Sequence, residues 1–417
     1  MISKNFSPAQ AMKENFFPAM EAARQNYLQT GTIRSFGSSF FAFDEDAMKK
    51  ISLSLSTEIT LHEKVNPAQL QAATDKAVEV CPYVAFDISK RGDIVYFHKN
   101  NLPFVVRKAG EIEEFGTDAL NRHYALVEYD GDKIIFNVSH VLSDVTGIFY
   151  FVQAVLDFYF GKEKTFYQGA DKIDFAADLM SQDLPLPDDF EPKDYKVENH
   201  FVPPEINPSD SGKKNETFIE MPTQKFKAVC KKYNVSAQVA LSILLAKAVQ
   251  KTHPQNEKII SVRGPVNTRS ALQVPNTFQN ASVPHVFLNI EPRWLNGEFP
   301  AEALENLKKD IAEQCSYENL AAFTNRLRKF FTTKDTSERK AMGVAYKRQT
   351  DVFASYIGNV LTADTFAHVK SFRQKFSAAY PLMVYAYKCS DVVVLQVIQS
   401  FDNPSYMENF LKVVNEL

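Results

Sequence analysis

A long segment near the middle of the chain, residues 181–215, places the strongest constraint on the fold. It is rich in Pro, Asp and Lys, and it is poor in the periodic apolar residues of a helix or a strand. Irregular loops of this length are uncommon inside a compact domain, and 417 residues exceed what one hydrophobic core usually serves. We therefore expect two domains, residues 1–180 and 216–417, joined by a crossover linker at 181–215.

Strand and helix patterns are mixed in both halves. In the first half, Asn66 and Pro67 are typical of the start of a helix, and Asp130-Gly131 is a hairpin signal between two alternating runs. We predict strands at 51–63, 94–98, 124–140, 216–222, 258–269, 282–290, 351–360, 382–389 and 391–400, and helices at 66–80, 145–159, 223–234, 235–251, about 300–348 and 405–417. Hairpins occur rather than strict βαβ alternation, so the expected class is α/β (α+β), a sandwich built twice.

Composition and charge exclude several classes of protein. The net charge is −3 and no Lys/Arg cluster is interleaved with aromatic residues, which disfavours nucleic-acid binding. The N-terminus lacks the apolar run of a signal peptide, and no uncharged stretch is long enough to span a bilayer. The cysteines, at 81, 230, 315 and 389, form no CxxC pair, so neither a zinc site nor a disulfide framework is expected. We expect a soluble, reduced, cytoplasmic monomer with no metal and no tightly bound cofactor.

Two polar residues, His140 and Asp144, interrupt an otherwise apolar stretch. Residues 133–138 alternate like a central strand, and residues 145–159 have helical apolar spacing. His140 therefore lies at the end of a strand, on a rigid support, where a neutral imidazole with a pKa of about 6.5 can accept a proton. Asp144 can either orient His140 or cap the helix and pair with a distant cation, and Ser143 is an alternative cap. The tight four-residue turn favours the second role for Asp144.

The HxxxD spacing is a weak signal when taken alone. With eight histidines, such a pair arises in about a third of sequences of this size, and a hydrogen-bonded core histidine is the simpler interpretation. The neighbouring residues strengthen the signal, because "SHVLSDVTG" (139–147) resembles the HxxxD motif of the CoA-dependent acyltransferase superfamily. That group includes alcohol acetyltransferases, plant acyltransferases, polyketide-associated acyltransferases and the condensation domains of nonribosomal peptide synthetases.

Four further segments resemble the same superfamily. "NVSAQVALSILLAKAVQK" (234–251) resembles its buried helix after the crossover, and "RGPVNTR" (263–269) is similar to its PVN-x-R strand. "NTFQNASV" (276–283) resembles the segment that follows that strand, and "ASYIGNV" (354–360) resembles a strand near the end. Motif order, spacing and the mid-chain linker all match, so the resemblance covers nearly the whole chain.

The resemblance implies two chloramphenicol-acetyltransferase-like sandwich domains with a tunnel between them. Acyl-CoA, or the pantetheine arm of an acyl carrier protein, would enter from one face and a small alcohol or amine from the other. His140 would act as the general base, and Asp144 would be structural and pair with an arginine of the second domain. Arg269 is the position that matches, and Arg263 is the fallback, although a solvated surface charge is the simpler interpretation of Arg263.

The sequence also departs from the superfamily pattern. Val145 stands where most members have Gly, and a β-branched side chain there would narrow the tunnel, which Gly147 compensates only in part. "SYIGN" replaces the DFGWG motif, which leaves the oxyanion donor unassigned, and Ser355 and Asn280 are candidates for the oxyanion site or the tunnel wall. Two alternatives to a CoA-dependent transferase therefore stay open. One is an inactive binding or scaffolding protein, and the other is a carrier-protein-dependent, condensation-type transferase.

Overall fold

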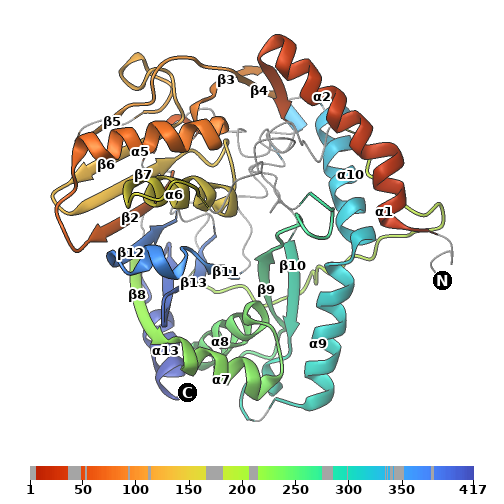
Figure 1. Ribbon diagram of the computed structural model, residues 1–417. Coiled ribbons are helices and arrows are strands. Elements are labelled where there is room, and N and C mark those ends of the chain that lie inside the picture. Colours follow the sequence, from red (N-terminus) through yellow and green to blue (C-terminus); the bar gives the residue numbers. More distant parts are fainter. Residues whose placement is uncertain are drawn as a thin grey trace.

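The first half of the chain builds a mixed five-stranded sheet that one strand of the second half completes. The strand order is β12 (Val369–Lys375), β2 (Leu55–Leu61), β7 (Lys133–Val138), β6 (Ala125–Asp130) and β5 (Val106–Lys108). Helices α5 (Pro67–Val80) and α6 (Val145–Tyr159) pack against each other over one face of this sheet (Figure 1). The antiparallel pairing of β12 with β2 brings the two halves of the chain into one sheet.

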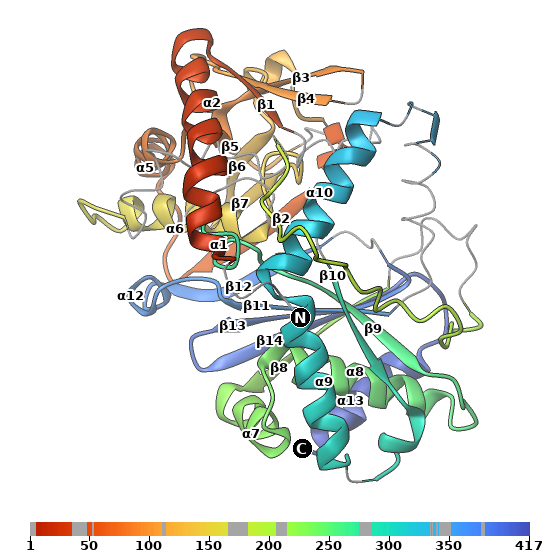
Figure 2. The same ribbon diagram turned by 90° about the vertical axis from the view of Figure 1, so that its right-hand side faces the viewer.

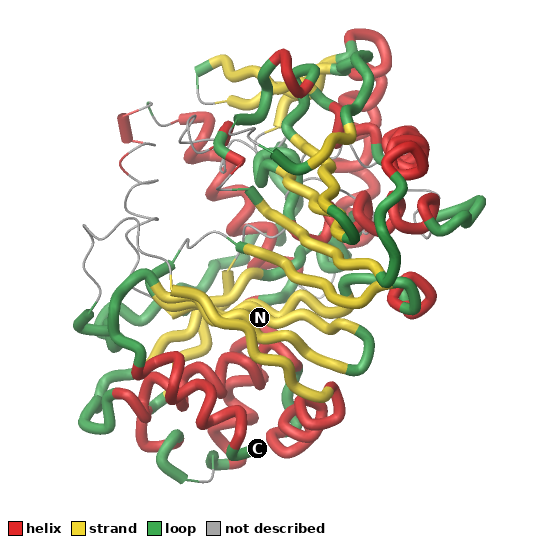
Figure 3. Tube along the Cα trace, turned by 90° about the vertical axis from the view of Figure 1, so that its left-hand side faces the viewer, coloured by secondary structure: helices red, strands yellow, loops and turns green. Residues whose placement is uncertain are grey.

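The second half builds a six-stranded sheet. Its order is β10 (His285–Ile290), β9 (Ile260–Pro265), β11 (Val352–Asn359), β13 (Leu382–Cys389), β14 (Val392–Gln399) and β8 (Asn215–Pro222). Helices α7 (Thr223–Tyr233), α8 (Ala237–Thr252) and α13 (Ser405–Asn415) gather on one side of it, as Figure 3 shows, and α9 (Ala301–Gln314) packs on β10. The other face of the six-stranded sheet, which these helices do not cover, is turned toward the first half of the chain.

A second connection between the halves forms at the N-terminus. The helices α1 (Pro8–Ala11) and α2 (Phe17–Thr30) flank a π-helical turn, Met12–Phe16, and lead into a small sheet of order β1 (Thr32–Ser35), β4 (Ile94–His98) and β3 (Asp87–Arg91). Met12 and Phe16 share a core cluster with Tyr317 and Leu320 of α10 (Tyr317–Thr333). Figure 2 shows α10 beside these N-terminal helices.

The largest hydrophobic core joins both halves. It contains Phe136 and Phe149 of the first half together with Phe353, Phe372 and Tyr387 of the second half. The rings of Phe149 and Phe372 lie 5.8 Å apart. A separate core lies between the six-stranded sheet and α7, α8, α9 and α13. The open face of the six-stranded sheet is therefore buried against the first half.

The structure describes most of the chain, and the elements expected there form where the sequence places them. Asn66 caps α5, Gly131 has a φ of 62° in the β6–β7 turn, and α8 is buried along most of its length. The expected helical region 300–348 is divided into α9 and α10 as far as Thr333, and most of its remainder lies outside the described residues. Four observed strands, β1, β3, β5 and β12, were not expected. The residues described are 6–35, 48–51, 54–92, 94–110, 114–165, 182–205, 215–274, 285–297, 299–333, 335, 337, 338, 341, 352–376 and 380–417.

The mixed α/β class is confirmed, while the division into 1–180 and 216–417 stays a prediction. Residues 182–205 contain no regular helix or strand, as expected of a linker. However, β12 lies beyond the linker and belongs to the first sheet. Within the described ranges, every helix is too short or too polar to cross a membrane.

Candidate active site

His140 lies in a short turn between the end of β7 and the start of α6. The backbone N–H of Ser139 donates to the carbonyl of Tyr124 at 2.9 Å, and the Ser139 hydroxyl donates to the carbonyl of Met48 at 3.0 Å. The N–H of Leu142 closes the turn by donating to the Ser139 carbonyl at 3.0 Å. The His140 side chain is half-buried and its Nδ1 atom is buried. The turn thus holds the imidazole on a supported backbone.

Asp144 begins α6 as its N-cap. Its Oδ1 accepts a hydrogen bond from the N–H of Gly147 at 3.0 Å, which satisfies one of the open donors at the start of the helix. The carbonyl of Gly147 in turn accepts from the hydroxyl of Tyr83 at 2.8 Å. Burial raises the pKa of Tyr83 well above its ordinary value, so this hydroxyl remains a neutral donor. The first turn of α6 is therefore fixed at both the N–H and the carbonyl of Gly147.

Arg269 binds Asp144 from the second half of the chain. Two guanidinium nitrogens donate to the two carboxylate oxygens, both at 2.8 Å, in the bidentate geometry that suits this pair. The side chains are 3% and 4% exposed, so the charges are shielded from water. The pKa of Arg269 lies above its ordinary value. Burial acts to lower this pKa, but the negative charge of Asp144 and the hydrogen bonds to it outweigh the effect of burial. The ion pair links the two halves four residues from His140.

Arg263 is not the surface charge that was expected. It lies in β9 and is 3% exposed, and its guanidinium donates to the hydroxyl of Tyr380 at 3.4 Å. The same group lies 4.8 Å from the centre of the Phe287 ring, which is within cation–π range. The alternation of β9 turns Arg263 toward the first half rather than toward solvent, so the surface interpretation is wrong.

The remaining candidates occupy different places. Val145 is the first residue of α6 and packs, half-buried, against the shared core. Ser355 is buried in β11 opposite Tyr385 of β13. Asn280 lies outside the described residues. Sequence analysis missed Tyr83, because its contact with Gly147 depends on a tertiary arrangement that no local motif reports.

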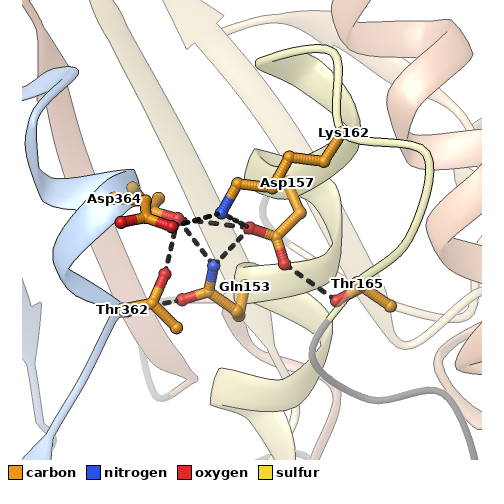
Figure 4. Close-up of polar contacts among 7 residues, drawn as sticks. Gln153, Asp157, Lys162, Thr165, Thr362 and Asp364 are labelled. Carbon is orange, nitrogen blue, oxygen red and sulfur yellow. Dashed lines mark hydrogen bonds and ion pairs between the residues drawn. The ribbon is translucent and has the colours of Figure 1, made fainter.

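A buried polar cluster holds the second half of α6. The amide of Gln153 donates to Asp157 and to the hydroxyl of Thr365, both at 2.7 Å, and accepts from the N–H of Thr362 at 2.8 Å. Thr362 and Thr365 belong to the segment around α12 (Ala363–Phe366), which leads into β12. Figure 4 shows the side chains of Gln153 and Asp157 converging with Thr362 between the two segments. Asp157 is also contacted by the hydroxyl of Thr165 at 3.0 Å and the amine of Lys162 at 2.9 Å. The cluster thus fixes α6, which follows the turn of His140, to the segment that leads into β12.

The turn between β7 and α6 places an imidazole beside a carboxylate that is already engaged. Among the described residues, no three or more His, Cys, Asp or Glu side chains are grouped so that they could hold a metal ion. An imidazole on a rigid turn can take a proton from a hydroxyl or an amine near neutral pH. The carboxylate nearest to it in sequence is engaged by Arg269 and by the N-terminus of α6.

Comparisons with known proteins give structural matches. No protein-family model matches the sequence, and no curated protein matches it. The TRI3 trichothecene 15-O-acetyltransferase from Fusarium sporotrichioides superposes with a TM-score of 0.62 at 12% identity, covering 93% of this chain and 94% of that one. TRI101 from F. graminearum, complexed with coenzyme A and deoxynivalenol, gives 0.61 at 13% identity, with coverage of 90% and 96%.

A bacterial protein matches equally widely. Polyketide synthase associated protein 5 from Mycobacterium tuberculosis gives a TM-score of 0.59 at 11% identity and covers 92% of this chain and 98% of that one. At such low identity these likenesses establish the fold alone. They cover both halves of the chain.

Proposed function

This chain has the two-domain, chloramphenicol-acetyltransferase-like fold of CoA-dependent acyltransferases and condensation-type domains, and from that premise we propose that it transfers an acyl group. The donor is an acyl-CoA, acetyl-CoA included, and the acceptor is the hydroxyl or amine of a small molecule. One observation carries the proposal. The buried pair of Asp144 and Arg269 joins the two halves at the N-terminus of α6, next to the turn of His140.

In the proposed reaction His140 is the general base. Because Nδ1 is buried, we assign proton transfer to Nε2. Nε2 takes the proton of the acceptor as its oxygen or nitrogen attacks the thioester carbonyl. The tetrahedral intermediate then collapses, the C–S bond breaks, and the imidazolium returns the proton to the departing CoA sulfur. The site must exclude water while this happens, because water would otherwise compete for the acyl group.

Asp144 and Arg269 are positioning residues in this proposal. They contact each other and the first turn of α6, and they hold the backbone that carries His140. Such support matters because a displacement of about 1 Å in a catalytic group can lower the rate by about a hundredfold.

Val145 supports a second candidate, a binding protein that keeps the fold without catalysis. Its branched side chain packs beside the motif where most members of the superfamily have glycine. One assay separates the two candidates. The purified protein is incubated with acetyl-CoA and longer acyl-CoAs, with and without a panel of alcohols and amines, and the release of free thiol is followed.

We expect acceptor-dependent thiol release that falls by about a hundredfold or more in His140→Ala. His62→Ala is the matched control, because His62 is exposed. It should retain the wild-type rate. Equal and negligible release from wild type and His140→Ala across the panel contradicts the acyltransferase proposal. Calorimetry with CoA then tests whether the fold binds CoA without catalysis.

A further inference from the structure

Three polar side chains form a row across the six-stranded sheet. Ser355 of β11 pairs with Tyr385 of β13, and Tyr385 pairs with Gln396 of β14. Neighbouring strands lie about 4.8 Å apart, so the row spans about 10 Å. It presents a hydroxyl, a phenol and an amide, none of them charged. We call these three residues the polar row.

The polar row lies on the face of the sheet that is turned toward the first half. Side chains alternate between the two faces of a strand, and Gln396 lies between Val394 and Ile398, which both belong to the core shared by the two halves. Phe353, two residues before Ser355, belongs to the same core. The row therefore lies on the interdomain face, where apolar side chains surround it.

Gln396 is the most unusual member of the row. It is 0% exposed, and neither its amide nitrogen nor its amide oxygen has a hydrogen-bond partner among the residues that the structure describes. Gln153 is also buried, but its amide donates to Asp157 and accepts from Thr362. A buried amide without partners destabilises a fold, whereas an apolar side chain of the same shape would not. A bound ligand that pairs with both atoms of the amide would remove this cost.

We propose that the polar row recognises the acceptor, and that this acceptor is a neutral, ring-containing molecule with hydroxyl or carbonyl groups on an apolar skeleton. That the ligand is the acceptor rests on the proposed function. Its chemical class is inferred from the polar row itself. Gln396 donates to and accepts from polar oxygens of the ligand, and the hydroxyls of Tyr385 and Ser355 extend the contact toward β11.

The surroundings of the row match such a ligand. The ring of Phe376 stacks on Tyr385 with centroids 3.7 Å apart, and the ring of Phe353 lies 5.6 Å from that of Tyr385. Burial raises the pKa of Tyr385 above its ordinary value, so the phenol is neutral at physiological pH. Flat apolar surfaces next to uncharged hydrogen-bonding groups suit a rigid carbon skeleton that carries a few polar oxygens.

The first test measures stability without ligand. Gln396→Met keeps the length of the side chain and removes the amide, so we expect a Tm equal to or above that of the wild type. Gln153→Met is the matched control, since it removes an amide that has partners, and its Tm should fall by several degrees. A Tm for Gln396→Met that falls as far as that of the control shows that the amide is satisfied within the folded protein, and it overturns the proposal.

The second test measures binding without catalysis. Decalin-2,6-diol and decalin-2-ol share one apolar skeleton and differ by one hydroxyl, and each is titrated into wild type, His140→Ala and Gln396→Met in a thermal-shift assay. We expect the wild type and His140→Ala to bind the diol at least tenfold more tightly than the monoalcohol, and Gln396→Met to lose that preference. The preference should survive in Gln153→Met. Equal binding of both alcohols by the wild type overturns the proposal.

The acyltransferase function and the recognition role of the polar row can each be refuted without the other. Binding that depends on Gln396 in a protein that releases no thiol from any acyl-CoA supports the row and contradicts the transferase. Thiol release that depends on His140, with no preference for the diol, supports the transferase and contradicts the row.

Discussion

Replacing Asp144 by Asn removes one charge from a buried pair while keeping the shape of the side chain. Asparagine caps helices about as well as aspartate, so the hydrogen bond to the N–H of Gly147 is retained. The amide offers one acceptor oxygen in place of two, so one of the two 2.8 Å bonds from Arg269 is lost. The guanidinium, on a residue that is 2% exposed, is left without a counter-charge. Breaking a buried pair in this way costs about 3–5 kcal/mol, and we expect that loss in the free energy of unfolding.

Urea denaturation followed by circular dichroism measures the loss. Arg269→Met should cost a similar amount, because it leaves the Asp144 carboxylate buried without its partner. The double variant should cost about 2–3 kcal/mol less than the sum of the two single variants, because it leaves neither charge alone. Asp87→Asn is the control. Its partner Arg122 is 54% exposed at the side chain, and an exposed pair contributes less than about 1 kcal/mol.

Additive losses in the double variant would refute this reasoning, since they would mean that the two charges do not stabilise each other. Losses below about 1 kcal/mol in both single variants would refute it as well, because the pair would then behave like the exposed Asp87–Arg122 pair.

Two further predictions concern titratable groups that take no part in the proposed reaction. Burial lowers the pKa of His123 to about 4, so the unfolded chain binds a proton more readily than the folded one below pH 6.5. The free energy of unfolding should therefore fall by up to about 1.4 kcal/mol per pH unit between pH 6.5 and 4, and His123→Phe should lose this contribution in urea titrations at pH 7, 5.5 and 4.5. Burial raises the pKa of Cys81 and of Cys389 to about 12, while Cys230 and Cys315 remain partly accessible. An aromatic disulfide reagent at pH 8 should then label two thiols in the native protein and four in urea, and a native count of four would contradict this assignment.

Elements with strong local signals were predictable from the sequence. The apolar spacing of residues 145–159 and the capping aspartate before them define α6, and Asn66 with Pro67 defines the start of α5. These signals act within one or two turns of the chain, so they do not depend on the rest of the fold. The strand β12 was missed because it lies at the edge of its sheet, where Lys and Arg interrupt the apolar pattern.

Contacts between distant segments were not predictable from local patterns. Arg269 and Asp144 are separated by 125 residues, and it was the resemblance to a superfamily, rather than a physical pattern, that suggested their pairing. The burial of Arg263 depends on how the open face of the six-stranded sheet meets the first half. The bond between Gln153 and Thr365 spans 212 residues and likewise carries no local signal. Local patterns in the sequence define single helices and strands. Contacts of this kind form only when those elements pack together.

The crossover of β12 has a consequence for how this protein is made. The hydroxyl of Thr57 in β2 donates to the side chain of Gln374 in β12, and the two residues are 317 positions apart. During synthesis β2 therefore emerges long before its partner strand. Until β12 leaves the ribosome, β2 has no partner on this side, and an unpaired strand edge of this kind promotes aggregation. Closing so long a loop is also slow, so the joining of the two halves through β12 comes late in folding. A fragment that ends before β12 would keep this edge open permanently.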